Sequence, residues 1–186
     1  MQLKDIWAPT KEGNFISVLP GLAHPFSRGR SHIRSTDAEV YPKIEMNYLE
    51  HPLDLEILAR HMLQVETLMR TTPMCNMLKP NGRRMPEGHD SVMTLEEAKE
   101  LVKAGSITNY HPSGTCAMMP EELGGVVNER LLVYGTKRLR VVDASIFPIE
   151  PRGNIMTTVY AVAEKAADMI KEDLRGEAAP VTNGFH

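Results

Sequence analysis

The sequence lacks several features that mark common protein classes. It contains two cysteines, Cys75 and Cys116, and neither lies in a C-x-x-C pair or at zinc-ligand spacing from a histidine. A structural metal is therefore not expected, and the cysteines are interpreted as buried free thiols or as one disulfide. No run approaches the about 18 apolar residues of a membrane span. A membrane is therefore not expected as a partner. Lys and Arg are scattered, so a nucleic acid is not expected either.

Several short catalytic motifs are also absent. The chain has no G-x-S-x-G nucleophile elbow, no H-E-x-x-H zinc helix and no phosphate-binding P-loop. It also has no G-x-G-x-x-G, the glycine-rich turn that holds the pyrophosphate of a dinucleotide at a helix N-terminus. These absences argue against nucleophilic serine, zinc-peptidase and nucleotide-hydrolysing chemistry.

The composition that remains describes an ordinary globular protein. Apolar residues make up 42% of the chain and charged residues 24%, with a formal net charge of −3. A chain of this size can bury about 70% of its unfolded surface. One domain over residues 1–186 is therefore the expected count.

Strand patterns come first along the chain, and a helix pattern follows them. Residues 15–19 and 30–35 are rich enough in β-branched and aromatic residues to predict strands. Residues 43–48 alternate apolar and polar side chains, as a half-buried antiparallel strand does. Over residues 53–71 the apolar positions recur at three- and four-residue steps, which predicts an amphipathic helix.

The second half of the chain contains two further helix patterns around a hairpin pattern. Thr94 and Glu97 form a capping box, which predicts a short helix. Residues 131–134 and 139–142 are expected to pair as a hairpin around a glycine turn. Residues 155–174 have the strongest helical periodicity in the chain.

His111 is the histidine whose setting differs from the other six. Pro112 favours an extended backbone at His111, and Ser113–Thr115 allow a tight loop in which backbone could approach a ligand. An imidazole titrates near neutral pH, so such a residue could take a proton from a substrate hydroxyl. A structural or surface histidine is the alternative.

Asn154 and Asp143 each have a structural and a functional interpretation. Asn154 stands directly before the long C-terminal helix, where asparagine is a good N-cap. The same position directs the first N–H groups of the helix toward a bound anion. Asp143 follows an apolar strand pattern, so it either contacts a ligand at the strand's carboxyl end or only ends the strand.

Four segments of the chain carry ordered motifs at compatible spacing. They are His24–Gly29, Tyr110–Cys116, Gly125–Ser145 and Gly153–Asp168. Together they resemble the C-terminal portion of the glucose–methanol–choline (GMC) flavin oxidoreductases, and the similarity covers nearly the whole chain.

The resemblance implies an α+β fold, in which an antiparallel sheet has helices packed on one face. The substrate-binding part would occupy about residues 14–120. A C-terminal strand and helix, within about residues 125–175, would return to complete an FAD-binding domain.

The resemblance also implies roles for particular residues. His111 and Asn154 match the two family positions that face the flavin ring. By that analogy His111 takes the proton of an alcohol substrate while its hydride passes to FAD, and Asn154 hydrogen-bonds the substrate oxygen. The residues expected to contact the cofactor are Asp143, Ala144, Gly153, Asn154, Ile155, Met156 and Thr157.

Family members carry an N-terminal nucleotide-binding unit with a glycine-rich turn, which this sequence does not contain. The expected partner is therefore a missing or separate N-terminal FAD-binding region. The alternative interpretation is a truncated, stand-alone protein that kept the fold without redox activity. Such a protein would serve as a ligand-binding module or as a non-redox lyase or cyclase.

Overall fold

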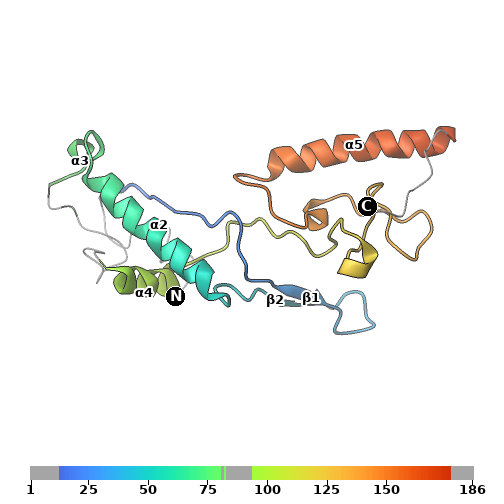
Figure 1. The fold of residues 1–186 in the computed structure, drawn as a ribbon, viewed down its shortest axis with the longest axis horizontal. Helices are drawn as coiled ribbons and strands as arrows, with labels where there is room; N and C mark the ends of the chain where they lie inside the picture. Colours follow the sequence, from blue (N-terminus) through green and yellow to red (C-terminus); the bar gives the residue numbers. More distant parts are fainter. Residues whose placement is uncertain (1–12, 81, 83–93, 177–186) are drawn as a thin grey trace. The chain divides into compact units, whose positions relative to one another are not determined.

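The computed structural model describes residues 13–80, 82 and 94–176 (Figure 1). The described residues form two compact units. The first lies within Met1–Gly29 and Glu45–Thr108, and the second within Arg30–Ile44 and Asn109–His186. A two-stranded antiparallel sheet and several helices together confirm the expected α+β class. The functional division into residues 14–120 and 125–175 stays a prediction.

Helices α2 (Pro52–Arg70) and α4 (Leu95–Gly105) form the centre of the first unit. Both follow the sequence expectation, because their apolar positions recur at helical spacing. The two helices pack together through small and branched side chains, so their backbones approach closely. The buried residues of this core are Ala59, Ala98, Leu101 and Val102.

Side chains cap the N-termini of both helices. At α4 both bonds of the predicted capping box form, Thr94 N to Glu97 Oε2 at 2.9 Å and Glu97 N to Thr94 Oγ1 at 3.2 Å. At α2 the Nδ1 atom of His51 accepts a bond from Leu53 N at 3.3 Å. A further short helix, α3 (Met74–Met77), was not predicted from the sequence.

Asp54, in the first turn of α2, anchors the motif around Phe26 and Ser27. Its side chain is only 1% exposed. The two carboxylate oxygens accept bonds from Phe26 N at 2.8 Å and Ser27 N at 2.7 Å. Burial acts to raise the pKa of Asp54, but hydrogen bonds from Ser27 and Phe26 outweigh it and hold the pKa below its ordinary value of 3.8. The carboxylate therefore satisfies two backbone donors of a loop.

Strands β1 (Arg30–His32) and β2 (Lys43–Glu45) pair within residues predicted to be strands, over shorter lengths. Gly29 precedes β1, and a Cβ atom there would lie 2.6 Å from the Glu45 carbonyl oxygen. The close approach of the two backbones thus requires glycine at this position.

The predicted strand over residues 15–19 is wrong, since the structure has no strand there. Ile16, Val18 and Leu19 are exposed. Strand propensity describes side chains that suit a paired, half-buried surface. Among the described residues no neighbouring strand pairs with this segment, so its propensity has no effect.

In the second unit, helix α5 (Met156–Arg175) packs against an irregular β-like region. The predicted hairpin is present, with Val133 N bonded to Leu139 O at 2.9 Å and Val141 N to Leu131 O at 3.2 Å. It forms one antiparallel bridge, between Leu132 and Arg140, rather than two full strands. The buried core of this unit contains Val127, Leu131, Ile146, Phe147, Ile155 and Ala166.

The C-terminal half of α5 is held to this region by charged groups. Arg130 bonds Glu172 at 3.0 Å and Asp173 at 2.8 Å, and Arg140 also bonds Asp173. The bonds from Arg140 and Arg130 lower the pKa of Asp173 below its ordinary value. Gly176, at φ +72°, then ends the helix in the left-handed conformation that glycine adopts without strain.

Among the described residues, no helix combines the length and the apolar character that crossing a lipid bilayer demands.

Replacing Asp54 by Asn should lower the free energy of unfolding at neutral pH by about 1–3 kcal/mol, because an amide nitrogen would face one of the two backbone donors. The folded-state pKa of Asp54 is depressed, so its contribution is present above the unfolded value and is lost as pH falls through the folded value. Urea unfolding of wild type and Asp54→Asn should therefore converge in acid.

The matched control is Glu56→Gln, which alters an exposed carboxylate paired with Arg60 on the same helix. Its effect on stability should be much smaller, because water screens an exposed ion pair. Equal unfolding free energies for Asp54→Asn and Glu56→Gln at neutral pH would refute the anchoring role of Asp54.

Candidate functional site

The segment that carries His111 runs alongside the segment that begins at Asp143, in the second unit. Three backbone bonds join them: Gly114 N to Ala144 O at 3.4 Å, Cys116 N to Ser145 O at 2.9 Å and Met118 N to Ile146 O at 2.8 Å. Two regions about thirty residues apart in sequence thereby become neighbours. The structure brings together the predicted His111 and Asp143–Ala144 segments, as one site requires.

Gly114 is required for this close pairing. Its φ of +86° lies in the region that favours glycine, and an added Cβ would lie 3.2 Å from the Phe147 carbonyl oxygen. The sequence interpretation of Ser113–Thr115 as a tight loop is consistent with this geometry.

His111 is half-buried, with 18% of its side chain exposed. Its Nδ1 atom lies 3.2 Å from Asn109 Nδ2 and 3.9 Å from Glu150 Oε1. Tyr110 between them has φ +59°, an uncommon value for a bulky residue, and this left-handed turn lets the Asn109 and His111 side chains meet. Asn109 and Glu150 were not predicted as site residues, since only the fold brings Glu150 to the histidine.

Asn154 lies one residue before the N-cap of α5, which is Ile155, so the prediction of Asn154 as the N-cap is wrong by one position. Its side chain nevertheless satisfies the N–H of the first helical residue. Its Oδ1 atom accepts a bond from Met156 N at 3.0 Å. Because a backbone N–H can only donate, the atom that faces Met156 must be oxygen, and this fixes the orientation of the amide. The Nδ2 group, with its two N–H donors, is directed away from the cap bond. Asn154 is exposed, so that donor is accessible.

Asp143 also caps a helix, rather than ending a strand. Its Oδ1 atom accepts a bond from Ser145 N at 2.8 Å, at the start of the short 3-10 helix η2 (Ala144–Ile146). The expectation of a regular strand leading into Asp143 is wrong, because residue 140 makes one bridge and residues 141 and 142 make none. The second carboxylate oxygen of Asp143, which is exposed, remains available to a hydroxyl donor.

The remaining predicted cofactor residues differ in accessibility. Gly153, Met156 and Thr157 are exposed, whereas Ile155 is 7% exposed and belongs to the core. The side chain of Ile155 therefore holds the start of α5 against the core. Glu150 links the two halves of the site, because it contacts His111 and lies four residues before Asn154.

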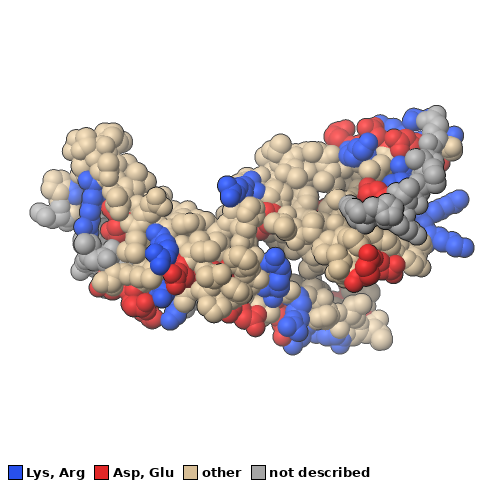
Figure 2. Space-filling model, viewed as in Figure 1, with Lys and Arg blue, Asp and Glu red and all other residues tan. Residues whose placement is uncertain are grey.

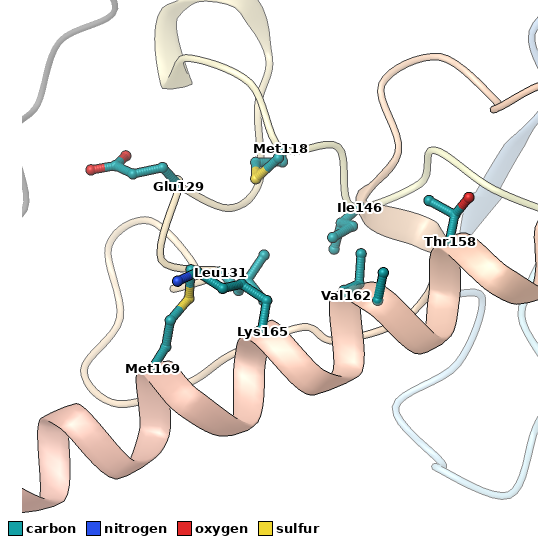
Figure 3. Close-up of a pocket in the computed structure, with 9 residues that line it drawn as sticks. Met118, Glu129, Leu131, Ile146, Thr158, Val162, Lys165 and Met169 are labelled. Atoms are coloured by element: carbon teal, nitrogen blue, oxygen red, sulfur yellow. The ribbon is translucent and has the colours of Figure 1, made fainter.

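A hollow of about 280 Å³ lies on the same unit, between α5 and the irregular β-like region (Figure 3). In the close-up, Val162 and Met169 of α5 face Ile146 and Leu131, Lys165 extends from α5 toward Leu131, and the Glu129 carboxylate points away from them. The walls are almost entirely apolar. Neither His111 nor Asn154 lines this hollow, so it is separate from the predicted site.

The start of α5 fits one side of a flavin ring system. Residues 156–163 carry no charge, and Met156 and Tyr160 are 60% and 67% exposed, so they offer an apolar surface. Gly153 has φ +77° and open space where a side chain would stand. The helix start favours the electron-rich end of such a ring.

The charged residues of α5 lie after its first two turns. Both acidic and basic side chains gather over α5 on the face shown in Figure 2, and they belong to residues from Glu164 onward. Among the residues that the structure describes, no three His, Cys, Asp or Glu side chains are grouped to hold a metal ion.

Comparison with known proteins identifies similar chains. The family model described as "GMC oxidoreductase" matches residues 25–163. The GMC oxidoreductase family protein Mala s 12 of Malassezia sympodialis is 41% identical over 155 residues, which are 83% of this chain and 24% of that protein.

Two solved structures are also similar. An FAD-dependent oxidoreductase from Chaetomium thermophilum superposes with a TM-score of 0.75 at 34% identity, covering 82% of this chain and 26% of that one. A fungal aryl-alcohol oxidase superposes with a TM-score of 0.70 at 33% identity, with coverage of 83% and 25%. The chain thus spans about a quarter of the length of the proteins it matches.

Replacing Asn154 by Ala should lower the free energy of unfolding by about 0.5–2 kcal/mol, because Met156 N loses its acceptor. Asn154→Asp should leave stability nearly unchanged, since a carboxylate oxygen caps equally well and suits the helix dipole. Chemical unfolding followed by circular dichroism measures both. If Asn154→Asp proves as destabilising as Asn154→Ala, the side chain does not act as the cap.

Proposed function

The chain belongs to the GMC oxidoreductase family, and on that premise we propose that it forms the C-terminal catalytic and substrate-binding part of an FAD-dependent oxidoreductase. The reaction is oxidation of the CH–OH group of an alcohol. The observation that carries the proposal is the pairing of the His111 segment with the Asp143 segment, together with a half-buried imidazole 3.9 Å from Glu150, four residues before Asn154.

His111 takes the proton of the substrate hydroxyl. Its Nδ1 atom faces Asn109 and Glu150, which leaves Nε2 as the nitrogen for the substrate. Proton transfer by a positioned side chain of this kind contributes about 10²–10⁴-fold to a rate. Flavin, when bound, supplies the acceptor for the hydride that leaves the carbinol carbon.

Asn154 orients the substrate oxygen through its Nδ2 group. The cap bond to Met156 N uses Oδ1 and holds the amide in one orientation. The two remaining N–H donors can then bond the oxygen as negative charge develops on it. One asparagine thereby serves both the helix and the reaction.

The backbone from Gly153 to Thr157 would lie against the flavin ring, and Asp143 and Ala144 would lie near the ribityl and pyrophosphate parts. The exposed carboxylate oxygen of Asp143 suits a ribityl hydroxyl. The N-terminus of α5 directs its partial positive charge at the ring, an electrostatic contribution available without reorganisation.

A partner region would supply the other wall of the flavin site. The chain covers about a quarter of its relatives, and it has no G-x-G-x-x-G turn for the pyrophosphate. We assign that task to the N-terminal three quarters of the family sequence. The apolar hollow beside α5 offers a surface against which such a region can pack.

The proposal is tested by joining this chain to the N-terminal three quarters of a family member and following anaerobic bleaching of the bound flavin by an alcohol. Replacing His111 by Ala should slow bleaching at saturating alcohol by about 10²–10⁴-fold. The matched control is His61→Ala, a half-buried histidine on α2 with no role in the reaction, which should bleach at the wild-type rate.

Two results would count against the proposal. Bleaching at the wild-type rate in His111→Ala would remove this residue from the mechanism. A fully flavinylated protein that no alcohol bleaches would instead favour the non-redox alternative, in which the fold retains a ligand-binding or acid–base role.

A further inference from the structure

A histidine that acts as a base must keep the lone pair of the reacting nitrogen free. In neutral imidazole one ring nitrogen carries the proton and the other does not. For His111 to accept a substrate proton at Nε2, its own proton must therefore reside on Nδ1. Which nitrogen carries it is decided by the groups that contact Nδ1.

The two contacts at Nδ1 favour opposite tautomers. Asn109 presents Nδ2 at 3.2 Å, and donation from an amide N–H would leave the proton of His111 on Nε2. Glu150 presents Oε1 at 3.9 Å, and an ionised carboxylate can only accept, which requires a proton on Nδ1. With Asn109 donating, His111 is a hydrogen-bond donor toward the substrate; with Glu150 accepting, it is a base.

The two partners differ in their freedom to adapt. An asparagine amide can turn over and offer Oδ1 instead of Nδ2, after which it accepts from the Nδ1 proton as well. An ionised glutamate cannot become a donor. Only the tautomer with Nδ1 protonated satisfies both neighbours, so the carboxylate decides between the two forms.

Burial and distance make this influence effective. The His111 and Glu150 side chains are 18% and 24% exposed, so water screens their interaction only in part. At 3.9 Å the pair is longer than a hydrogen bond. A rotation of the Glu150 side chain that shortens the separation by about 1 Å would form one within the usual 2.7–3.2 Å range.

We propose that Glu150 is a positioning residue for His111: its carboxylate accepts the bond from Nδ1–H and so keeps Nε2 free to act as the base. In the reaction the substrate proton moves to Nε2, Nδ1 keeps its own proton, and Glu150 stays ionised beside the imidazolium that results. The inference rests on the proposed function, since it assigns a protonation state that serves the base role of His111.

The test reads the tautomer directly, in the ¹⁵N-labelled chain, by long-range ¹H–¹⁵N correlation of the His111 ring at a pH where it is neutral. The expected spectrum has Nδ1 at the position of a protonated ring nitrogen and Nε2 at that of an unprotonated one. In Glu150→Gln the populations should shift toward the Nε2–H form. Asn109→Ala should keep Nδ1 protonated.

The matched control is Glu164→Gln, which alters an exposed glutamate on α5 and should leave the His111 ring signals unchanged. A wild-type His111 that is mainly protonated on Nε2 would overturn the inference, and so would a tautomer unaffected by Glu150→Gln. If Glu150→Gln fails to fold, the wild-type spectrum still shows which ring nitrogen of His111 is protonated, and a proton mainly on Nε2 overturns the inference.

This outcome is separable from the proposed function, because the measurement needs neither flavin nor substrate. An Nε2–H tautomer together with alcohol-dependent bleaching would overturn the role of Glu150 alone. An Nδ1–H tautomer in a flavinylated protein that no alcohol bleaches would overturn the proposed function alone.

Discussion

The backbone pairing between Gly114–Met118 and Ala144–Ile146 is the constraint on which the proposed site depends. It places the loop that carries His111 against the segment that leads through Glu150 to Asn154 and α5. Ile146 and Ile155, both buried, lock that segment into the core of the second unit. The exposed polar groups therefore stand on a packed framework, and small displacements of the framework would be transmitted to them.

Two polar residues of the proposed site combine a structural hydrogen bond with a second hydrogen-bonding group that is accessible. Asn154 and Asp143 each use one oxygen to cap a helix and leave a second polar group accessible. Capping also orients each side chain, which is what a binding site requires of its contacts. From the sequence alone, the structural and functional interpretations of such a residue compete. In the structure they are compatible, because different atoms of the same side chain serve the two roles.

Local patterns made much of the fold predictable. The capping box at Thr94, the periodicity of α2 and that of α5 depend on residues close in sequence, and all three helices formed as expected. The strand predicted over residues 15–19 did not form, because strand pairing depends on residues that are distant in sequence. His111 and Asn154 could be selected from motifs, whereas Glu150 could not, since only the fold brings it to His111.

In the proposed function, His111, Ala144 and the start of α5 form one wall of a flavin site. Adding FAD to the ¹⁵N-labelled chain and following the backbone amides tests it most directly, because weak binding still moves resonances. The amides of Ala144, Gly153 and Thr157 should shift together with that of His111, while those of α4 should not. Shifts confined to other residues, or no shift at millimolar FAD, would contradict it.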